Sequence, residues 1–177
     1  LNIGILGAGF LGNYSANILL KLGYKVQGFK YTKPSKKYNF PIFYKKKDLN
    51  EFIKTSDVIV SLLPATSKTK DMIDKKFLKS MKKNSLLISV GRGSVVNEKH
   101  LSSHLKKNKF FYASLDVFKS EPLSKNHVLW SLPNITITPH VASLTVVRSA
   151  VNYMYKRYQE FKKNNKIKND VNLKKGY

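Results

Sequence analysis

Residues 2–12 read NIGILGAGFLG, an apolar run that is followed by glycines at positions 7, 9 and 12. The apolar run predicts a buried strand, and a helical pattern begins at about Leu11. Glycines with this spacing between a strand and a helix are typical of a turn that binds the phosphates of a dinucleotide. The first twelve residues therefore predict a parallel α/β sheet with a nucleotide site at the end of its first strand.

Each glycine of this turn has a separate physical task. Gly7 permits the tight turn, Gly9 lets a pyrophosphate approach the backbone, and Gly12 lets the helix pack closely on the strand. The amides at the start of the helix would point at the phosphates, helped by the helix dipole. We predict that the cofactor-binding residues of this turn are Gly7, Gly9, Phe10, Leu11 and Gly12.

Outward from this turn, short apolar runs alternate with helix-like segments along the chain, as in parallel α/β proteins. The predicted strands are residues 2–6, 25–29, 57–63, 85–90, 111–117 and 134–138. The predicted helices are about residues 11–22, 75–81, 97–107 and 144–164, with a short helix from about 48 and a Pro- and Lys-rich loop over 32–47. On the first helix we expect the packed face to consist of Leu11, Ser15, Ile18, Leu19 and Leu22.

This pattern predicts a Rossmann-like, doubly wound parallel sheet of the α/β class in a single domain. We expect the dinucleotide-binding domain to cover residues 1–165, including the long C-terminal helix. A polar tail would follow over residues 166–177.

The chain has 177 residues, the size of one domain, and a formal net charge of +23. Such a charge could indicate a nucleic-acid binder. However, 30 of the basic residues are lysine and three are arginine, and the lysines are scattered over the whole chain. Phosphate-reading surfaces usually also use the planar fork of arginine. We therefore predict no specific nucleic-acid partner, although the charge favours anionic ligands such as cofactor phosphates.

The composition also bounds the compartment and the kinds of site. The sequence contains no apolar run of about 18 residues, which a membrane-spanning helix would need, so we expect no membrane partner. Cysteine is absent, which excludes disulfides and thiolate metal sites and fits a cytoplasmic protein. His100 and His104 are four apart on a predicted helix, but no third ligand is evident, and we predict no metal.

Three charged residues that could carry catalysis follow predicted strands. Arg92 lies between two glycines after the fourth strand, Glu121 follows the fifth, and His140 follows the sixth. Because ligands bind at the carboxyl ends of parallel strands, we expect these side chains to meet. A histidine suits proton transfer near neutral pH, and a carboxylate beside it stabilises the imidazolium. An arginine can bind the carboxylate of a substrate and polarise its carbonyl group. Each alone could be structural, but together they predict reduction of a carbonyl.

The end of the second strand is where a site for NAD normally has an acid that binds the ribose 2′-hydroxyl. This chain has no acid there and instead reads FKYTK over residues 29–33. A carboxylate would repel a 2′-phosphate, whereas an ammonium attracts it. We therefore predict a preference for NADPH over NADH, with contacts from Lys30, Thr32 and Lys33.

In these motifs and their order, the chain resembles the nucleotide-binding domain of the D-isomer-specific 2-hydroxyacid dehydrogenases. The matching stretches are ILGAGFLG (5–12), LLPAT (62–66), GRGSVV (91–96), LDVF (115–118), EPL (121–123) and ITPHVA (137–142). Within the family it is most similar to the glyoxylate/hydroxypyruvate reductase A group, a group that favours NADPH. The residues that point to this group are Leu129-Trp130 ahead of 135–140 and the closing Lys175-Gly176-Tyr177.

The resemblance implies an oxidoreductase that reduces small 2-oxo acids, such as glyoxylate and hydroxypyruvate, to 2-hydroxy acids. In that enzyme Arg92 would bind the 2-oxo acid, His140 would be the acid/base, and Glu121 would pair with His140. The remaining implied residues lie in the cofactor cleft: Asp116 at the nicotinamide carboxamide, and Leu63 and Pro64 along the wall.

The sequence departs from the family pattern at two positions. Ser89 stands where the family often has Asn, and Asn97 stands where an acid usually follows the valines. Neither is in the catalytic set, and Asn97 is an acceptable helix N-cap. We expect both departures to be tolerated.

The family has a second domain, built mostly from the N-terminal part of the chain, and this sequence contains none of it. We therefore expect an incomplete protein whose other domain closes over the substrate and excludes water. The final helix carries more aromatic surface than one face can bury, at Tyr153, Tyr155, Tyr158 and Phe161. Part of it would pack on that domain or on a second subunit of a homodimer, with ordinary core packing as the alternative.

Two other functions remain open. One is an NADH-dependent dehydrogenase of another substrate class, against which the missing acid after the second strand argues. The other is a dinucleotide-sensing protein without chemistry, against which the intact set of Arg92, Glu121 and His140 argues.

Overall fold

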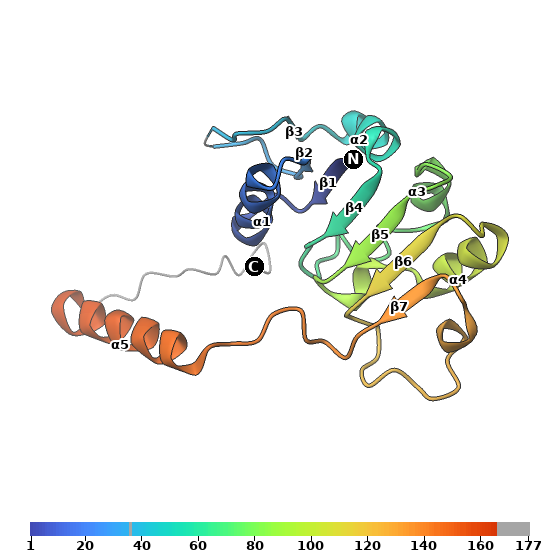
Figure 1. The fold of residues 1–177 in the computed structure, drawn as a ribbon. Coiled ribbons are helices and arrows are strands. Elements are labelled where there is room, and N and C mark those ends of the chain that lie inside the picture. The colour runs from blue at the N-terminus through green and yellow to red at the C-terminus, as the bar shows by residue number, and fades with distance from the viewer. Residues whose placement is uncertain (36, 166–177) are drawn as a thin grey trace. The chain divides into compact units, whose positions relative to one another are not determined.

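The computed structural model describes residues 1–35 and 37–165, and it divides into two compact units, one over Leu1–His140 and a second that begins at Val141. The first unit is built on a parallel sheet of seven strands in the order β3-β2-β1-β4-β5-β6-β7 (Figure 1). The strands are β1 (Asn2–Leu6), β2 (Lys25–Phe29), β3 (Ile42–Phe43), β4 (Val58–Ser61), β5 (Leu86–Ser89), β6 (Tyr112–Leu115) and β7 (Ile135–Ile137). This confirms the predicted Rossmann-like sheet.

The sheet reverses its winding beside β1. Strand β1 pairs in parallel with β2 on one side and with β4 on the other, so Leu6 lies opposite both Phe29 and Ser61. In open α/β sheets the ligand crevice forms at this switch point, outside the carboxyl ends of the strands. The glycine turn that follows Leu6 stands at that place.

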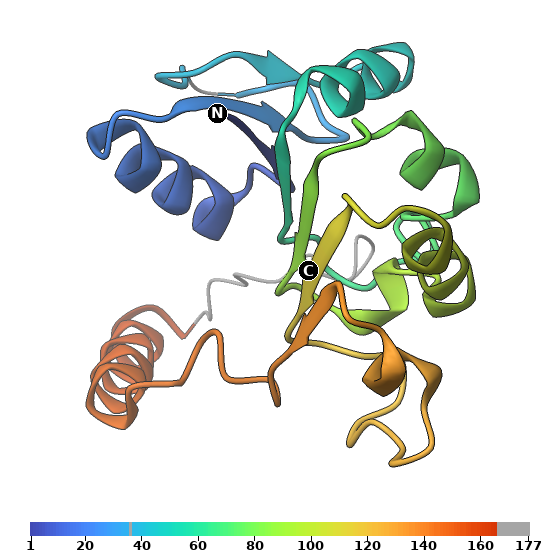
Figure 2. The ribbon, with the colours of Figure 1, turned by 45° about the vertical axis from the view of Figure 1, so that its right-hand side comes forward.

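Helices cover the two faces of the sheet unequally. Helix α1 (Phe10–Lys21) lies on one face, and α2 (Leu49–Thr55), α3 (Lys75–Ser80) and α4 (Glu98–Lys107) lie on the other (Figure 2). The larger apolar cluster includes Phe52 from α2, Leu78 from α3 and Leu101 from α4, all fully buried. Burying an apolar side chain of this size contributes about 1.5–3 kcal/mol. This packed face holds the strand ends in place.

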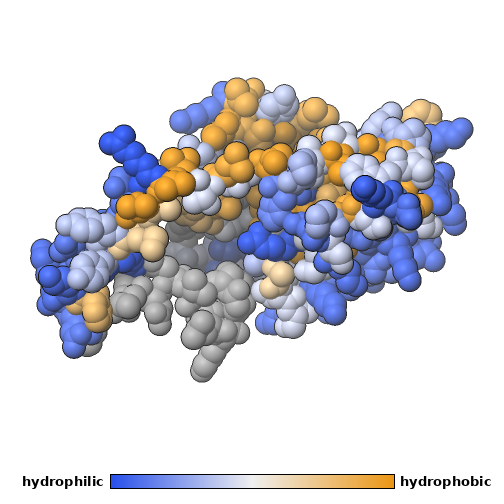
Figure 3. Space-filling view, turned by 90° about the horizontal axis from the view of Figure 1, so that it is seen from below, coloured by the Kyte–Doolittle hydropathy of each residue, from blue (hydrophilic) through white to orange (hydrophobic). Residues whose placement is uncertain are grey.

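The packed face of α1 differs from our prediction. Its buried residues are Gly12 and Ala16, whereas Leu11 and Leu22 are 59% and 68% exposed. Gly12 and Ala16 are small enough to let the helix lie close to the sheet, so the close contact selects small residues rather than the largest apolar ones. The expected face was therefore wrong at Leu11, Ile18 and Leu22, whereas Leu19 packs against the smaller apolar cluster as expected. Figure 3 shows hydrophobic side chains on the molecular surface among hydrophilic ones.

The expected loop over residues 32–47 contains a seventh strand that the sequence did not predict. Strand β3 has only two residues, Ile42 and Phe43, and it pairs with the end of β2. The Gly28 and Lys30 amides donate to the carbonyls of Pro41 and Phe43, at 2.9 and 3.0 Å. Two residues are too few to show an alternating pattern, which is why this strand escaped notice.

The second unit contains α5 (Val147–Asn164), whose C-cap, Asn165, has a left-handed conformation (φ 47°). No residue of α5 is buried, and Tyr153, Tyr155 and Tyr158 are each more than half exposed. The prediction that these aromatic residues pack on another domain or subunit stays a prediction, as does the assignment of residues 1–165 to one domain.

The tail, 166–177, lies outside the described residues, and so does the resemblance at 175–177. None of the helices in the described ranges is long and apolar enough to cross a membrane.

Candidate functional site

The turn after β1 is held against the end of β2. The Gly7 and Ala8 amides both donate to the Phe29 carbonyl, at 2.9 and 3.1 Å, and Gly7 has a φ of 108°, which side chains other than hydrogen rarely allow. A Cβ atom on Gly7 would lie 3.0 Å from the carbonyl carbon of Leu62, in the turn after β4. Glycine at this position therefore brings three strand ends together.

The other two glycines of the turn differ in their surroundings. A Cβ atom on Gly12 would lie 2.2 Å from the Gly7 carbonyl oxygen, whereas a Cβ atom on Gly9 would meet nothing within 4 Å. A glycine is thus required at position 12 by the packing of the turn itself, whereas Gly9 faces open space. Gly9 is also the N-cap of α1 without any side-chain hydrogen bond, so the first amides of the helix are available to an anion. This geometry fits a pyrophosphate.

The turn after β4 forms a wall beside the glycine turn. Leu63 is buried and Pro64 is half-buried, and the Pro64 carbonyl accepts a hydrogen bond from the Thr69 hydroxyl at 2.6 Å. The Thr69 hydroxyl also accepts a hydrogen bond from the Thr66 amide at 2.9 Å, which closes the loop locally. Thr69 was not among the residues singled out from the sequence.

At the end of β2, the three polar residues predicted to select the cofactor lie in different surroundings. Lys30 is half-buried and its Nζ donates to the Tyr38 hydroxyl at 3.2 Å, while Thr32 and Lys33 are exposed. The Tyr38 hydroxyl donates in turn to the Ala8 carbonyl at 3.0 Å. Tyr38, which the sequence analysis missed, thus connects Lys30 to the glycine turn.

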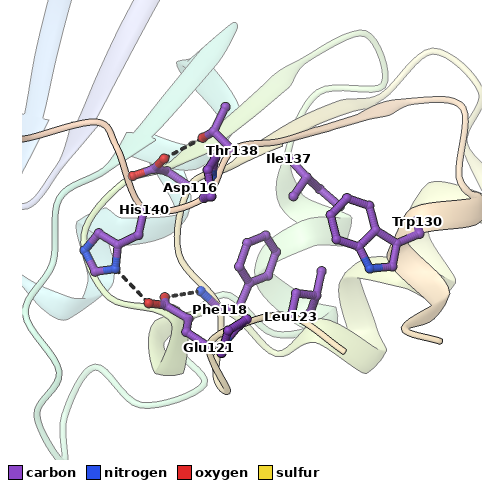
Figure 4. A pocket seen from close by; sticks show the side chains of 10 residues that line it. Asp116, Phe118, Glu121, Leu123, Trp130, Ile137, Thr138 and His140 are labelled. Carbon is purple, nitrogen blue, oxygen red and sulfur yellow. Dashed lines mark hydrogen bonds and ion pairs between the residues drawn. The ribbon is translucent and has the colours of Figure 1, made fainter. Parts of the chain in front are cut away.

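His140 and Glu121 form a hydrogen-bonded pair at the carboxyl ends of β6 and β7. The distance between His140 Nδ1 and Glu121 Oε2 is 2.7 Å, and Glu121 Oε1 accepts the Phe118 amide at 2.8 Å (Figure 4). Both oxygens of the carboxylate are therefore engaged, and the imidazole is held through one nitrogen. That arrangement leaves Nε2 for a proton transfer.

The contacts of Glu121 shift its ionisation. The hydrogen bond with His140 lowers the pKa of the Glu121 carboxyl below its ordinary value of 4.5, and the Phe118 amide lowers it further. Burial and the nearby Asp116 act in the opposite direction and are outweighed. Glu121 therefore stays a carboxylate at neutral pH and can stabilise a charged imidazole.

His140 owes its position to the backbone. It is in the left-handed region (φ 55°), and its amide donates to the Asp116 carbonyl at 2.9 Å. Asp116 is 3% exposed, and its side chain accepts a short hydrogen bond from the Thr138 hydroxyl. A non-glycine residue held in a sparsely populated conformation is often part of a functional site. Thr138 is a further residue that the sequence analysis did not single out.

The pair opens into a pocket of about 550 Å³. One side of the pocket is polar, with Asp116, Glu121 and His140, and the other side is apolar. The apolar wall consists of Phe118, Leu123, Trp130 and Ile137, which project toward the same space in Figure 4. A largely apolar pocket with a few convergent polar groups is the usual form of a small-molecule site.

Arg92 stands apart from this pocket. It follows β5 as the exposed N-cap of the short 3₁₀ helix η2 (Gly93–Val95), and its Nη1 donates to the Gly91 carbonyl at 2.8 Å. Within residues 1–35 and 37–165, no hydrogen bond or ion pair joins Arg92 to Glu121 or His140. The structure thus brings Asp116, Glu121 and His140 together but leaves Arg92 outside the pocket lining.

The remaining histidines have structural contacts. His100 Nδ1 accepts a hydrogen bond from the Lys75 amide at 3.2 Å. His104 packs edge-on against Phe111, with 4.6 Å between the ring centroids. Burial lowers the pKa of the His104 imidazole. Among the residues that the structure describes, no group of three or more His, Cys, Asp or Glu side chains could hold a metal ion.

Comparison with known proteins adds a family. Residues 1–142 match the family described as "D-isomer specific 2-hydroxyacid dehydrogenase, NAD binding domain". A curated relative, glyoxylate/hydroxypyruvate reductase A of Photorhabdus laumondii, is 34% identical over 175 residues, which are 99% of this chain and 56% of the relative. The chain thus spans about half the length of the curated relatives it matches.

Two solved structures superimpose closely on the chain. A D-isomer specific 2-hydroxyacid dehydrogenase from Xanthobacter autotrophicus, in complex with NADPH and MES, has a TM-score of 0.93 at 30% identity and is covered over 73% of its length. An NADPH-dependent glyoxylate/hydroxypyruvate reductase from Sinorhizobium meliloti, in complex with NADP and sulfate, has a TM-score of 0.92 at 29% identity and is covered over 57%. In both comparisons the whole of this chain is aligned.

Proposed function

Because the chain belongs to the D-isomer specific 2-hydroxyacid dehydrogenase family, we propose that it is the cofactor-binding part of an NADPH-dependent reductase of small 2-oxo acids, such as glyoxylate and hydroxypyruvate. The observation that carries this proposal is the pair of His140 and Glu121, 2.7 Å apart in a pocket at the carboxyl edge of the sheet. The glycine turn lies at the same edge, as a reaction between a dinucleotide and a small acid requires.

In the proposed reaction His140 gives a proton to the carbonyl oxygen of the acid. Bound NADPH supplies the hydride for the carbonyl carbon. Glu121, which holds His140 through Nδ1, directs Nε2 toward the substrate and stabilises the imidazolium before it releases its proton. The apolar wall of the pocket limits the water around the reacting atoms.

We assign Arg92 to the substrate. It is exposed at the end of β5, on the same edge of the sheet as His140, and its fork can bind the carboxylate of a 2-oxo acid in two hydrogen bonds. Its single bond to the Gly91 carbonyl leaves other donors of the guanidinium for that purpose. Asp116, at the end of β6, is assigned to the carboxamide of the nicotinamide.

We assign the cofactor preference to the end of β2. No acid stands there, and Lys30, Thr32 and Lys33 offer an ammonium and hydroxyl surface to a 2′-phosphate. Leu63 and Pro64 would line the cleft between this surface and the pocket. The complexes of two similar proteins with NADPH and NADP support the choice of cofactor.

Some properties of the whole protein follow from the same proposal. We propose that the complete reductase is cytoplasmic, which suits an enzyme that uses NADPH. We also propose a homodimer with a substrate domain that closes over the pocket. The chain spans only about half of its curated relatives, so these properties concern the complete protein.

The direct test is oxidation of NADPH and of NADH by the full-length protein, with glyoxylate, hydroxypyruvate and pyruvate as acceptors. The proposal predicts fast oxidation of NADPH with the first two acids. Activity with NADH alone would overturn the assignment of Lys30, Thr32 and Lys33 and leave the catalytic pair in place. Tight binding of the cofactor without turnover on any acid would instead indicate a dinucleotide-sensing protein.

A further inference from the structure

The loop that carries Glu121 is anchored from outside the pocket. Glu98 lies in the first turn of α4, and its side chain is 16% exposed. Its Oε1 accepts the Lys119 amide at 2.7 Å, two residues before Glu121, and its Oε2 lies 3.4 Å from His127 Nε2. One carboxylate therefore holds both ends of the segment between Lys119 and His127.

The same loop is pressed against the turn that follows Arg92. A Cβ atom on Gly93 would lie 1.9 Å from the Phe118 carbonyl carbon and 2.0 Å from its oxygen. No side chain fits there, so the backbones of Gly93 and Phe118 are in direct contact. The Arg92 turn and the Glu121 loop thus have a fixed mutual position, although no hydrogen bond or ion pair joins Arg92 to Glu121 in the described part of the chain.

These contacts meet at two consecutive peptide units. The Phe118 amide donates to Glu121 Oε1 at 2.8 Å, and the next amide, that of Lys119, donates to Glu98 Oε1. Hydrogen bonds to carboxylates are the stronger kind, and both ends of this short stretch depend on them. A change at Glu98 is therefore passed to Glu121 through the backbone of Phe118 and Lys119.

We propose that Glu98 is a positioning residue for the reaction, which holds the Glu121 loop so that Glu121 meets His140 at hydrogen-bond distance. This inference rests on the proposed function for its kinetic readout, but its structural readout does not. His127 is the second contact of Glu98 and secures the far end of the loop through the 3₁₀ helix η3 (Val128–Ser131), whose N-cap it is.

The test compares three variants at Glu98 in the full-length protein. Glu98→Ala removes both contacts, Glu98→Gln keeps an oxygen for the Lys119 amide, and Glu98→Asp keeps the charge but shortens the reach. Glu51→Ala is the matched control, because Glu51 is likewise an acid in the first turn of a helix, α2, and is exposed. It removes the same interaction with the helix dipole and no loop contact.

We expect Glu98→Ala to lower kcat about ten- to a hundredfold, as small misplacements of catalytic groups do, with little change in KM for NADPH. Glu98→Gln should recover most of the loss, and Glu51→Ala should match the wild type. Carbon-13 NMR of the Glu121 carboxyl should show that its pKa rises toward its ordinary value in Glu98→Ala, and by a smaller amount in Glu98→Asp, but not in Glu51→Ala. If Glu98→Ala does not fold, Glu98→Asp should show a smaller loss of kcat in the same direction.

Equal kcat in Glu98→Ala and Glu51→Ala would overturn the proposal. So would a Glu121 carboxyl that titrates as in the wild type when Glu98 is alanine or aspartate. Failure of the proposed function has a different signature, since the wild type would then turn over none of the acids. The NMR comparison of Glu121 would still decide the role of Glu98 in that case.

Discussion

Two regions along the carboxyl edge of the sheet are built by different means. At β1 the glycine turn is shaped by the backbone, because Gly7 and Gly12 leave room that other side chains would fill. At β6 and β7 the pocket is shaped by side chains, through the contacts of His140 with Glu121 and of Thr138 with Asp116. The first region requires glycines that have no Cβ atom, and the second requires a few polar atoms at hydrogen-bond distance from one another.

This difference separates binding from chemistry. Substitutions in the glycine turn should affect folding or cofactor affinity, whereas substitutions in the pocket should affect turnover. The largest effects should come from the pocket, because proton transfer requires a specific atom at a specific distance. The following changes test this division, from the largest expected effect to the smallest.

Replacement of His140 by glutamine should lower kcat by about 10²- to 10⁴-fold, since the variant has no group that delivers a proton to the substrate oxygen. The Kd for NADPH should stay within about threefold, because the glycine turn is unchanged. Steady-state kinetics and NADPH fluorescence titration measure the two quantities, with His100→Gln as the control. Equal losses in both would show that His140 is structural and would break the division.

The glycine turn should give the reverse result in a matched pair. Gly12→Ala places a Cβ atom 2.2 Å from the Gly7 carbonyl oxygen, so the free energy of unfolding should fall by about 1–3 kcal/mol or more. Gly9→Ala meets nothing within 4 Å, so its thermal stability should equal that of the wild type. Its affinity for NADPH should nonetheless fall by about tenfold or more if a pyrophosphate occupies that space. An unchanged affinity in Gly9→Ala would contradict the cofactor site.

Removal of the Thr138 hydroxyl tests the support of the pocket. Thr138→Val deletes the hydrogen bond to the buried Asp116 and should cost about 1 kcal/mol in the free energy of unfolding. Thr136→Val is the control, because Thr136 lies two residues earlier, in β7, and is exposed. Urea unfolding of both variants provides the comparison, and equal stabilities would mean that the Asp116 contact contributes nothing.

The smallest expected effect is the pH dependence of stability from Glu121. Its pKa is lowered by the folded-state contacts, so the unfolded chain binds the proton more tightly. The stabilisation is therefore present above about pH 4.5 and is lost as the pH falls through the lowered pKa. The side chain is 36% exposed, and solvent screening keeps the effect small.

Urea unfolding of the wild type and Glu121→Gln from neutral pH to about pH 3 measures this effect. The difference in stability between the two should be constant above the ordinary pKa and should shrink in acid. A difference that grows in acid would mean that the pair does not lower the pKa of Glu121.

Much of the fold could be predicted from the sequence because apolar runs and glycines act locally. Six strands lie where their apolar runs predicted them, and Gly7 has the positive φ that a tight turn requires. The prediction failed where the signal is not local. Strand β3 is too short for a pattern, and the face of α1 is set by the small residues Gly12 and Ala16 rather than by large apolar ones.

The site could be predicted in part. Spacing and family resemblance led to Glu121 and His140, which the structure places 2.7 Å apart. They did not lead to Thr138, Tyr38 or Glu98, since each contacts a segment at least 21 residues away through a single polar group. Such contacts leave no periodic trace in a sequence and follow only from the packing of the strand ends.

The most direct test of the account follows the transferred hydrogen. The full-length protein would be incubated with glyoxylate and with NADPH deuterated at the hydride-donating carbon of the nicotinamide, and the product would be examined by mass spectrometry and NMR. The account predicts glycolate with one deuterium on the carbon that bears the new hydroxyl. Glycolate without deuterium, or no glycolate despite bound NADPH, would contradict the claim that the glycine turn and the His140 pocket together serve hydride transfer.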